Sequence, residues 1–181
     1  MNYDMNIIKY CKKNFFRIAS IILIACFTLF GLTACSSTDN NKGNNDDTSL
    51  IQGTWEIDTG SGAGYKFVED KFMWLKSIED VNDNYWYGDV EYYNSSEAME
   101  IAGLTNDELQ SSLPGLKPEN IFVTKLDPQK IITDGEDKTS TNMNDQTLWT
   151  RLWLVEEKED NVVAVVIDLE TFSIESYSKV E

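Results

Sequence analysis

The sequence contains no histidine and only three cysteines among its 181 residues. Histidine is the side chain whose ordinary pKa lies nearest to neutral pH. Its absence excludes Ser-His and Cys-His nucleophile systems and imidazole metal sites. Two of the cysteines, Cys11 and Cys26, lie in a segment that we expect to be removed. The mature chain then has one cysteine and no disulfide, and a domain of this size needs none because its core is large enough.

Basic residues are scarce after the N-terminus. The chain has 15 Lys and Arg against 31 Asp and Glu, for a net charge of −16. Residues 1–35 carry a net charge of +3, whereas residues 50–181 carry 10 basic and 27 acidic side chains and a net charge of −17. Such an acidic domain repels phosphate backbones, so we expect no nucleic-acid partner. Most of the acids are expected to form a solvated surface.

The N-terminus has the three parts of a signal peptide. Met1–Arg17 is polar and basic, Ile18–Leu32 is almost entirely apolar, and small residues follow. Fifteen helical residues span about 22 Å at about 1.5 Å per residue. A bilayer core is about 30 Å thick, so the apolar run is short for a permanent span. The order of the parts therefore predicts a cleaved signal peptide over residues 1–34.

The residues at the end of this segment, Leu32-Thr33-Ala34-Cys35, resemble the lipobox of bacterial lipoproteins. The resemblance implies that a diacylglyceryl group is attached to the Cys35 sulfur and that a peptidase cuts between Ala34 and Cys35. Two acyl chains, palmitate for example, give a stable anchor where one gives only marginal attachment. We therefore expect a lipoprotein held to the extracytoplasmic face of the cell membrane by the lipid on Cys35.

Residues 36–49 (SSTDNNKGNNDDTS) contain no apolar side chain. Such a segment has nothing to bury and is predicted to be disordered. Its root-mean-square reach is about 20 Å. We expect residues 35–49 to be a tether and residues 50–181 to be the folded domain.

The folded domain is predicted to be mainly β, because its apolar residues recur with a period of two. About ten strands are expected in an antiparallel meander. They contain, in order, the following segments: 55–57, 65–67, 72–74, 85–92, 99–101, 121–126, 130–133, 148–155, 162–167 and 172–174. A tight turn is expected at Glu69-Asp70, and Asp127-Pro128 is expected to break the sixth and seventh strands into a hairpin.

One helix is expected to interrupt the strands. Thr105 and Glu108 have the spacing of a capping box, and Pro114 and Gly115 end the segment 105–113. The longest polar loop is expected at Asp134–Gln146.

Many short strands favour a closed barrel, since closure removes exposed strand edges. The opening Gly53-Thr54-Trp55 resembles the G-x-W that begins lipocalin-like (calycin-type) barrels. A second segment is similar to a late hairpin of bacterial lipocalin-like lipoproteins, and it consists of Val123–Leu126 and Lys130–Ile132. The resemblance implies ligand binding in the mouth of the barrel. A two-sheet β-sandwich is the alternative fold.

Aromatic residues are dense in the middle of the domain. Trp74, Trp86, Tyr87 and Tyr92 are candidate ligand-binding residues, as a stacking platform for a sugar or an apolar ligand. The other interpretation is that alternate rings fill the core. We expect large inward residues to fill the barrel, in the set Trp55, Phe67, Trp74, Trp86, Tyr92, Leu152 and Val165. A hollow barrel would instead be lined by small residues such as Gly88, Ala164 and Thr150.

No metal, cofactor or catalytic site is predicted. Asp80, Asn82, Asn84 and Glu91 have part of the spacing of a calcium loop, but Tyr85 stands where glycine is needed and strands flank it. No pair of carboxylates is marked out for acid catalysis. The expected function is non-enzymatic binding of a small apolar or sugar ligand. The alternatives are an acidic accessory protein with a filled barrel that contacts an envelope protein and, after it, a carboxylate-based hydrolase.

Overall fold

A computed structural model describes residues 48–142, 148–159 and 161–180. The predicted signal peptide, the lipobox with Ala34 and Cys35, and nearly all of the tether lie outside the described residues. In the described part of the chain, no helix has both the length and the apolar character needed to cross a bilayer.

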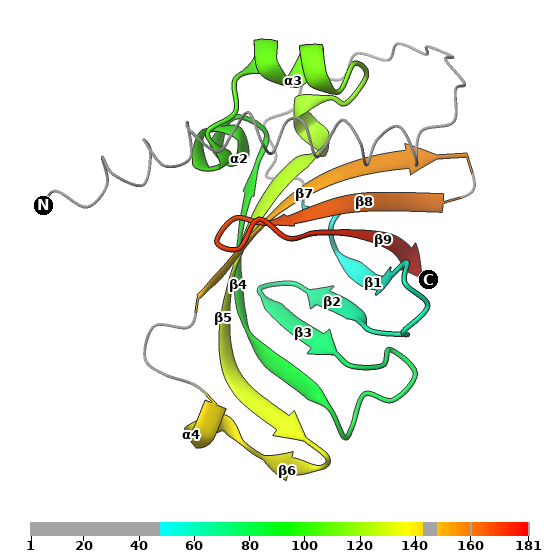
Figure 1. The fold of residues 1–181 in the computed structure, drawn as a ribbon, viewed down its shortest axis with the longest axis vertical. Helices are drawn as coiled ribbons and strands as arrows, with labels where there is room; N and C mark the ends of the chain where they lie inside the picture. The colour runs from blue at the N-terminus through cyan, green and yellow to red at the C-terminus, as the bar shows by residue number, and fades with distance from the viewer. Residues whose placement is uncertain (1–47, 143–147, 160, 181) are drawn as a thin grey trace, which may run out of the picture.

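The described residues form one closed antiparallel barrel (Figure 1). The chain order of the strands is β1 (Gly53–Ile57), β2 (Gly64–Val68), β3 (Lys71–Leu75), β4 (Tyr85–Asn94), β5 (Ile121–Thr133), β6 (Glu136–Asp137), β7 (Trp149–Lys158), β8 (Asn161–Asp168) and β9 (Ile174–Val180). Eight strands follow the order β4-β3-β2-β1-β9-β8-β7-β5, and pairing of β4 with β5 closes the ring. The short β6 pairs only with β5. The prediction of a mainly β barrel is confirmed, and the sandwich alternative is excluded.

The predicted strand at Met99 and Ile101 is wrong. These residues belong to a helix, α2 (Ser95–Ala102). Ala98 is buried and Met99 and Ala102 are partly buried, so the apolar positions follow the helical spacing of three to four residues. Two consecutive helices therefore stand between β4 and β5, where one was expected.

The predicted hairpin at Asp127-Pro128 is also wrong, because β5 runs through this point as one strand. The ladder between β4 and β5 shifts register between Tyr87 and Gly88, and Gly88 lies opposite Pro128. A proline has no N–H for a ladder, and a bulge accommodates it. A Cβ at Gly88 would lie 1.9 Å from the Asp127 carbonyl oxygen, so this close approach requires glycine.

Two further segments differ from expectation near the barrel rim. The last strand begins at Ile174, because Phe172 lies in the preceding turn with φ of 60°. The polar segment after Asp134 contains β6 and the short helix α4 (Thr139–Asn142), and residues 143–147 lie outside the described part. The tight turn at Glu69-Asp70 is confirmed between β2 and β3.

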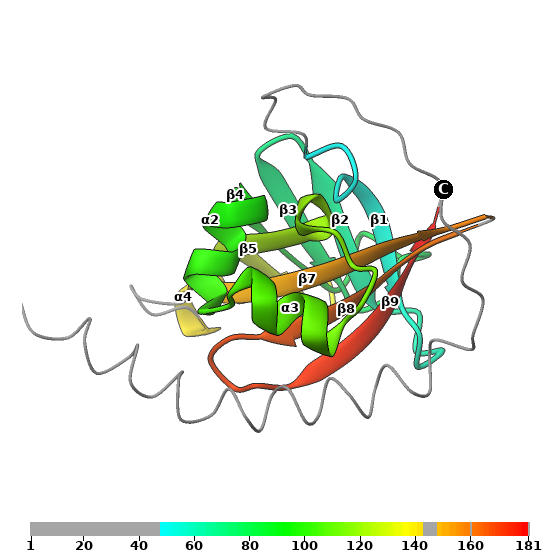
Figure 2. The ribbon, with the colours of Figure 1, turned by 90° about the horizontal axis from the view of Figure 1, so that it is seen from above.

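The predicted capping box is confirmed at the start of α3 (Asn106–Ser112). The Glu108 N–H donates to the Thr105 hydroxyl at 3.3 Å, and the Thr105 N–H donates to the Glu108 carboxylate at 3.0 Å. A 3-10 turn, η1 (Pro118–Asn120), then leads into β5. Figure 2 shows α2 and α3 lying outside the barrel wall, across β5, β7 and β8.

The helices explain why the predicted inward set is wrong at two positions. Leu152 and Val165 are buried with Ala98 and Leu109 in the cluster between the helices and the outer face of the barrel. Thr150 shares the face of Leu152, whereas Trp153 and Val166 point into the barrel. Both faces of β7 and β8 are apolar, because each strand packs on the barrel core and on the helices. The period of two therefore did not indicate which face was inside.

The barrel interior is filled by rings at one end. Trp55, Phe67, Phe72 and Trp153 are buried there, and Tyr65 and Tyr177 extend this packing to the middle of the barrel. The Trp153 ring centroid lies within 5.7 Å of those of Trp55, Tyr65, Phe67 and Tyr177. The Trp55 indole N–H donates to the Ile51 carbonyl at 2.8 Å, and the Trp153 indole N–H donates to the buried Thr124 hydroxyl at 3.1 Å. Ile51, two residues before the start of β1, is fully buried and closes this end. We call this the closed end.

Candidate functional site

The opposite end of the barrel holds a cavity of about 270 Å³ that is open to solvent. It lies where β3 and β8 end and where β4, β7 and β9 begin. Its aromatic lining consists of Tyr65, Trp74, Trp86 and Trp149, and the other lining residues are Arg151, Val166, Asp168, Ser173 and Glu175. The volume lies just below the range of about 300–1,000 Å³ typical of ligand pockets, so the cavity suits a small molecule.

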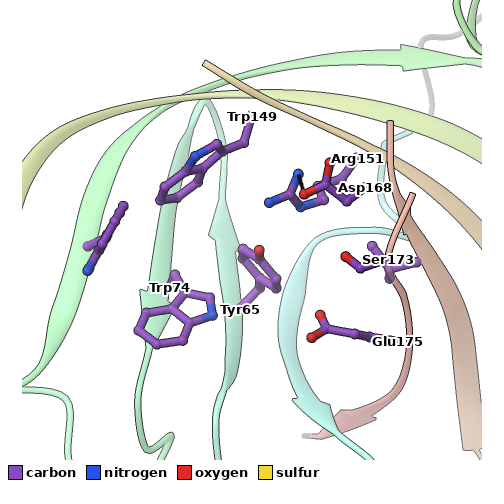
Figure 3. A pocket seen from close by; sticks show the side chains of 9 residues that line it. Tyr65, Trp74, Trp149, Arg151, Asp168, Ser173 and Glu175 are labelled. Atoms are coloured by element: carbon purple, nitrogen blue, oxygen red, sulfur yellow. Dashed lines mark ion pairs between the residues drawn. The ribbon is translucent and has the colours of Figure 1, made fainter. Parts of the chain in front are cut away.

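Trp74, Trp86 and Trp149 line the cavity. Figure 3 shows Trp74 and Trp149 on the side opposite to Asp168, Ser173 and Glu175. Trp86 and Trp149 pack with their ring centroids 4.5 Å apart and their planes tilted by 32°. Trp74 meets Trp86 nearly edge to face, at 6.3 Å and 71°. Trp74 and Trp86 are paired across β3 and β4, so the sheet register itself brings these two side chains together. The three rings stay only partly buried, which leaves aromatic surface for a ligand.

A charged pair stands on the other side of the cavity. Arg151 donates to Asp168 at 2.8 Å, and the two residues are direct partners in the β7–β8 ladder. The side chains are 15% and 12% exposed, so water screens the pair only weakly. The Arg151 guanidinium also lies 5.8 Å from the ring centroid of Trp149, within the range of a cation–π contact. The pair is thus fixed by its strands and by the tryptophan wall.

Tyr65 lies between the two walls and contacts the filled core behind it. Burial raises the pKa of the Tyr65 hydroxyl, and a hydrogen bond with Arg151 and its positive charge act in the opposite direction. The charges of Glu175 and Asp168 add to the increase. Tyr65 is therefore neutral at physiological pH and is a hydrogen-bonding group between the charged residues.

Glu175 is the exposed carboxylate of the cavity. Its Oε2 accepts a hydrogen bond from the Tyr177 hydroxyl at 2.7 Å. The pKa of Tyr177 is raised far above its ordinary value, mainly by burial and further by the neighbouring Tyr65 and Glu175. Tyr177 therefore stays a neutral hydrogen-bond donor. Glu175 is therefore held in position by a neutral group.

Two of the four predicted ligand-binding residues, Trp74 and Trp86, line the cavity. Tyr87 does not line it, because it alternates with Trp86 along β4 and pairs with Met73 and Lys130. Tyr92 lies inside the barrel at the closed end, with its ring centroid 6.1 Å from that of Phe67. Burial raises the pKa of Tyr92 to about 12, and the nearby Gln52 side chain acts in the opposite direction.

The sequence analysis missed Trp149, Arg151, Asp168 and Glu175. Trp149, Arg151 and Trp153 alternate along β7, so one correct inward assignment would have found all three. This assignment failed because Leu152 and Leu154 are apolar, so the opposite face of β7 also fitted the pattern expected of an inward face. Asp168 and Glu175 carried no signal of their own, because each is one acid among many.

No group of three or more acidic, cysteine or histidine side chains in the described ranges is placed to hold a metal ion. The residues of the calcium-like spacing have other partners: Asn84 accepts from the Asp134 N–H at 3.1 Å, and Glu91 accepts from the Tyr93 hydroxyl at 2.8 Å. What remains is a site with one aromatic wall and one polar wall, which is the composition of a small-molecule binding site.

Comparison with known proteins adds nothing about this cavity. The chain matches no protein-family model, no curated protein and no solved structure.

Proposed function

We propose that this chain is a lipid-anchored extracytoplasmic lipoprotein whose barrel binds a small ligand in its open end without acting on it chemically. The anchor rests on Leu32-Thr33-Ala34-Cys35, which follows an apolar segment of signal-peptide length. The binding role rests on one observation: the barrel is packed with rings at its closed end, yet leaves a cavity of about 270 Å³ lined by three tryptophans at the other.

The position of the tether supports this arrangement. The described chain begins at Thr48, and Ile51 enters the core of the closed end. Gln52 is hydrogen-bonded to Glu69, in the turn between β2 and β3 at that same end. A lipid on Cys35 would therefore attach to the membrane through the end opposite to the cavity. Anchoring leaves the entrance to the cavity free for a ligand.

The two carboxylates of the cavity argue for binding over hydrolysis. A glycosidase needs a pair of carboxyl groups that exchange protons with the substrate. Here Asp168 is engaged by Arg151 at 2.8 Å, and Glu175 is engaged by the Tyr177 hydroxyl at 2.7 Å. Both groups are fixed as parts of the cavity wall, where they would orient a ligand.

The test is a thermal-unfolding screen of the purified full-length chain against lipids, sugars and aromatic metabolites. A bound ligand raises the midpoint in proportion to the logarithm of its concentration over its Kd. We expect at least one compound to raise the midpoint by several degrees. Trp86→Ala should abolish that shift, whereas Tyr87→Ala, the next residue on β4 and outside the cavity lining, should preserve it.

If no compound shifts the midpoint, or if the shift survives Trp86→Ala, the cavity is not the site. The alternative of an acidic accessory protein that contacts an envelope protein would then be favoured. Its test is a pull-down from cells with the lipidated chain.

A further inference from the structure

The charges that line the cavity do not balance. Arg151 is the only basic lining residue among those described, and Asp168 at 2.8 Å offsets its charge. Glu175 then leaves the lining with one net negative charge, since its hydrogen-bond partner Tyr177 is neutral.

The tryptophan wall has one ring available for a ligand. The ring centroid of Trp149 lies 4.5 Å from that of Trp86 and 5.8 Å from the Arg151 guanidinium carbon. The Trp149 ring is therefore already in contact with two side chains. Trp74 has a ring contact only with Trp86 among the described residues. Figure 3 shows Trp74 and Glu175 on opposite sides of the cavity, with Tyr65 between them. A ligand that spans this space meets an indole at one end and a carboxylate at the other.

We propose that the cavity takes a small organic cation, an amine joined to an apolar body, with the body against Trp74 and the ammonium group toward Glu175. This inference rests on the proposed binding function and names its class of ligand. A carboxylate and an aromatic face are the two protein groups that attract an ammonium ion. The volume of about 270 Å³ limits the ligand to a small molecule.

The rest of the domain favours the same sign of charge. Residues 50–181 have a net charge of −17, which raises the local concentration of cations and repels anions. An anionic ligand would need a free basic group in the cavity, and Arg151 is already paired. A neutral sugar would stack on Trp74 equally well but would gain no ionic attraction from Glu175.

The experiment compares four probes by calorimetric titration of the full-length chain in a non-ionic detergent. Three share one body and differ in charge: 2-phenylethylammonium, 2-phenylethanol and 3-phenylpropanoate. The fourth is methyl glucoside, a neutral sugar. We expect 2-phenylethylammonium to bind about tenfold more tightly than 2-phenylethanol, and the other two to bind more weakly still. Added salt should weaken only the binding of the cation.

Three variants connect the result to the cavity. Glu175→Gln should remove most of the tenfold advantage of the cation and leave the affinity for 2-phenylethanol unchanged. Glu91→Gln, which removes the same charge from an exposed position on the outer face of β4, should preserve the advantage. Trp74→Leu should weaken the binding of both 2-phenylethylammonium and 2-phenylethanol.

The inference is overturned if the alcohol, the sugar or the anion binds as tightly as the cation, or if Glu175→Gln weakens cation and alcohol alike. In that case binding that depends on Trp74 would still support the proposed function. If none of the four probes binds, the inference is also overturned, and the proposed function is then decided by the wider screen described above.

Discussion

Removing the guanidinium of Arg151 is expected to destabilise the barrel strongly. Arg151→Met keeps most of the length of the side chain but leaves the Asp168 carboxylate, 12% exposed, without its counter-charge. Loss of one partner of a fully buried pair costs about 3–5 kcal/mol. This pair borders an open cavity, where water partly solvates the freed carboxylate, so we expect the lower end, about 3 kcal/mol. For a folded domain of residues 50–181, which lies between the two size classes, that corresponds to a decrease of about 10 °C in Tm.

The assay is urea and thermal unfolding of the full-length variants in the same detergent. Asp89→Asn is the matched control, since it breaks the Lys71–Asp89 ion pair, whose side chains are 40% and 41% exposed. Exposed pairs contribute at most about 1 kcal/mol, so this variant should unfold close to the parent. The double variant Arg151→Met with Asp168→Asn should recover part of the loss, with a coupling energy above about 1 kcal/mol. If Arg151→Met costs no more than Asp89→Asn, the pair does not support the cavity wall and the reasoning fails.

Three other perturbations test separate parts of the account. Cys35→Ser should abolish labelling of the protein by a fatty-acid probe, and unchanged labelling would refute the anchor. Thr105→Ala should destabilise α3 by about 1 kcal/mol, measured as faster hydrogen exchange in residues 106–112, because it removes the capping box. Burial raises the pKa of Tyr92 to about 12 in the folded state, whereas an unfolded tyrosine has a pKa of about 10. The stability that Tyr92 contributes is therefore fully present below about pH 10 and is lost as the pH rises toward 12. Tyr92→Phe should make the decrease in stability between about pH 10 and 12 less steep, and an unchanged slope would contradict this assignment.

The fold was largely predictable because hydrophobic periodicity is a local property. Trp55, Phe67 and Tyr92 were assigned to the interior from alternation alone, and all three lie there. The capping box of Thr105 and Glu108 was equally local and is confirmed. These features depend on residues a few positions apart, which one sequence displays directly.

The cavity was harder to predict because it depends on contacts between distant strands. Arg151 and Asp168 become partners only through the β7–β8 ladder, and their assignment required knowing that helices cover the other face of both strands. Met99 and Ile101 illustrate the same limit, since two apolar residues at a spacing of two fit a strand as well as part of a helix. The predicted residues Trp74 and Trp86 lie in the cavity because they share one face of paired strands.

The central claim, that the open end of the barrel binds a small ligand, has a direct test in the five tryptophans of the chain. Three line the cavity, whereas Trp55 and Trp153 lie in the closed core with their indole N–H groups bonded to Ile51 and Thr124. In a chain with ¹⁵N-labelled indoles, each tryptophan gives one N–H signal, assigned by single Trp→Phe variants. The most stabilising compound of the thermal screen should shift the signals of Trp74, Trp86 and Trp149 and leave those of Trp55 and Trp153 in place. A stabilising compound that moves none of the three cavity signals would contradict the account.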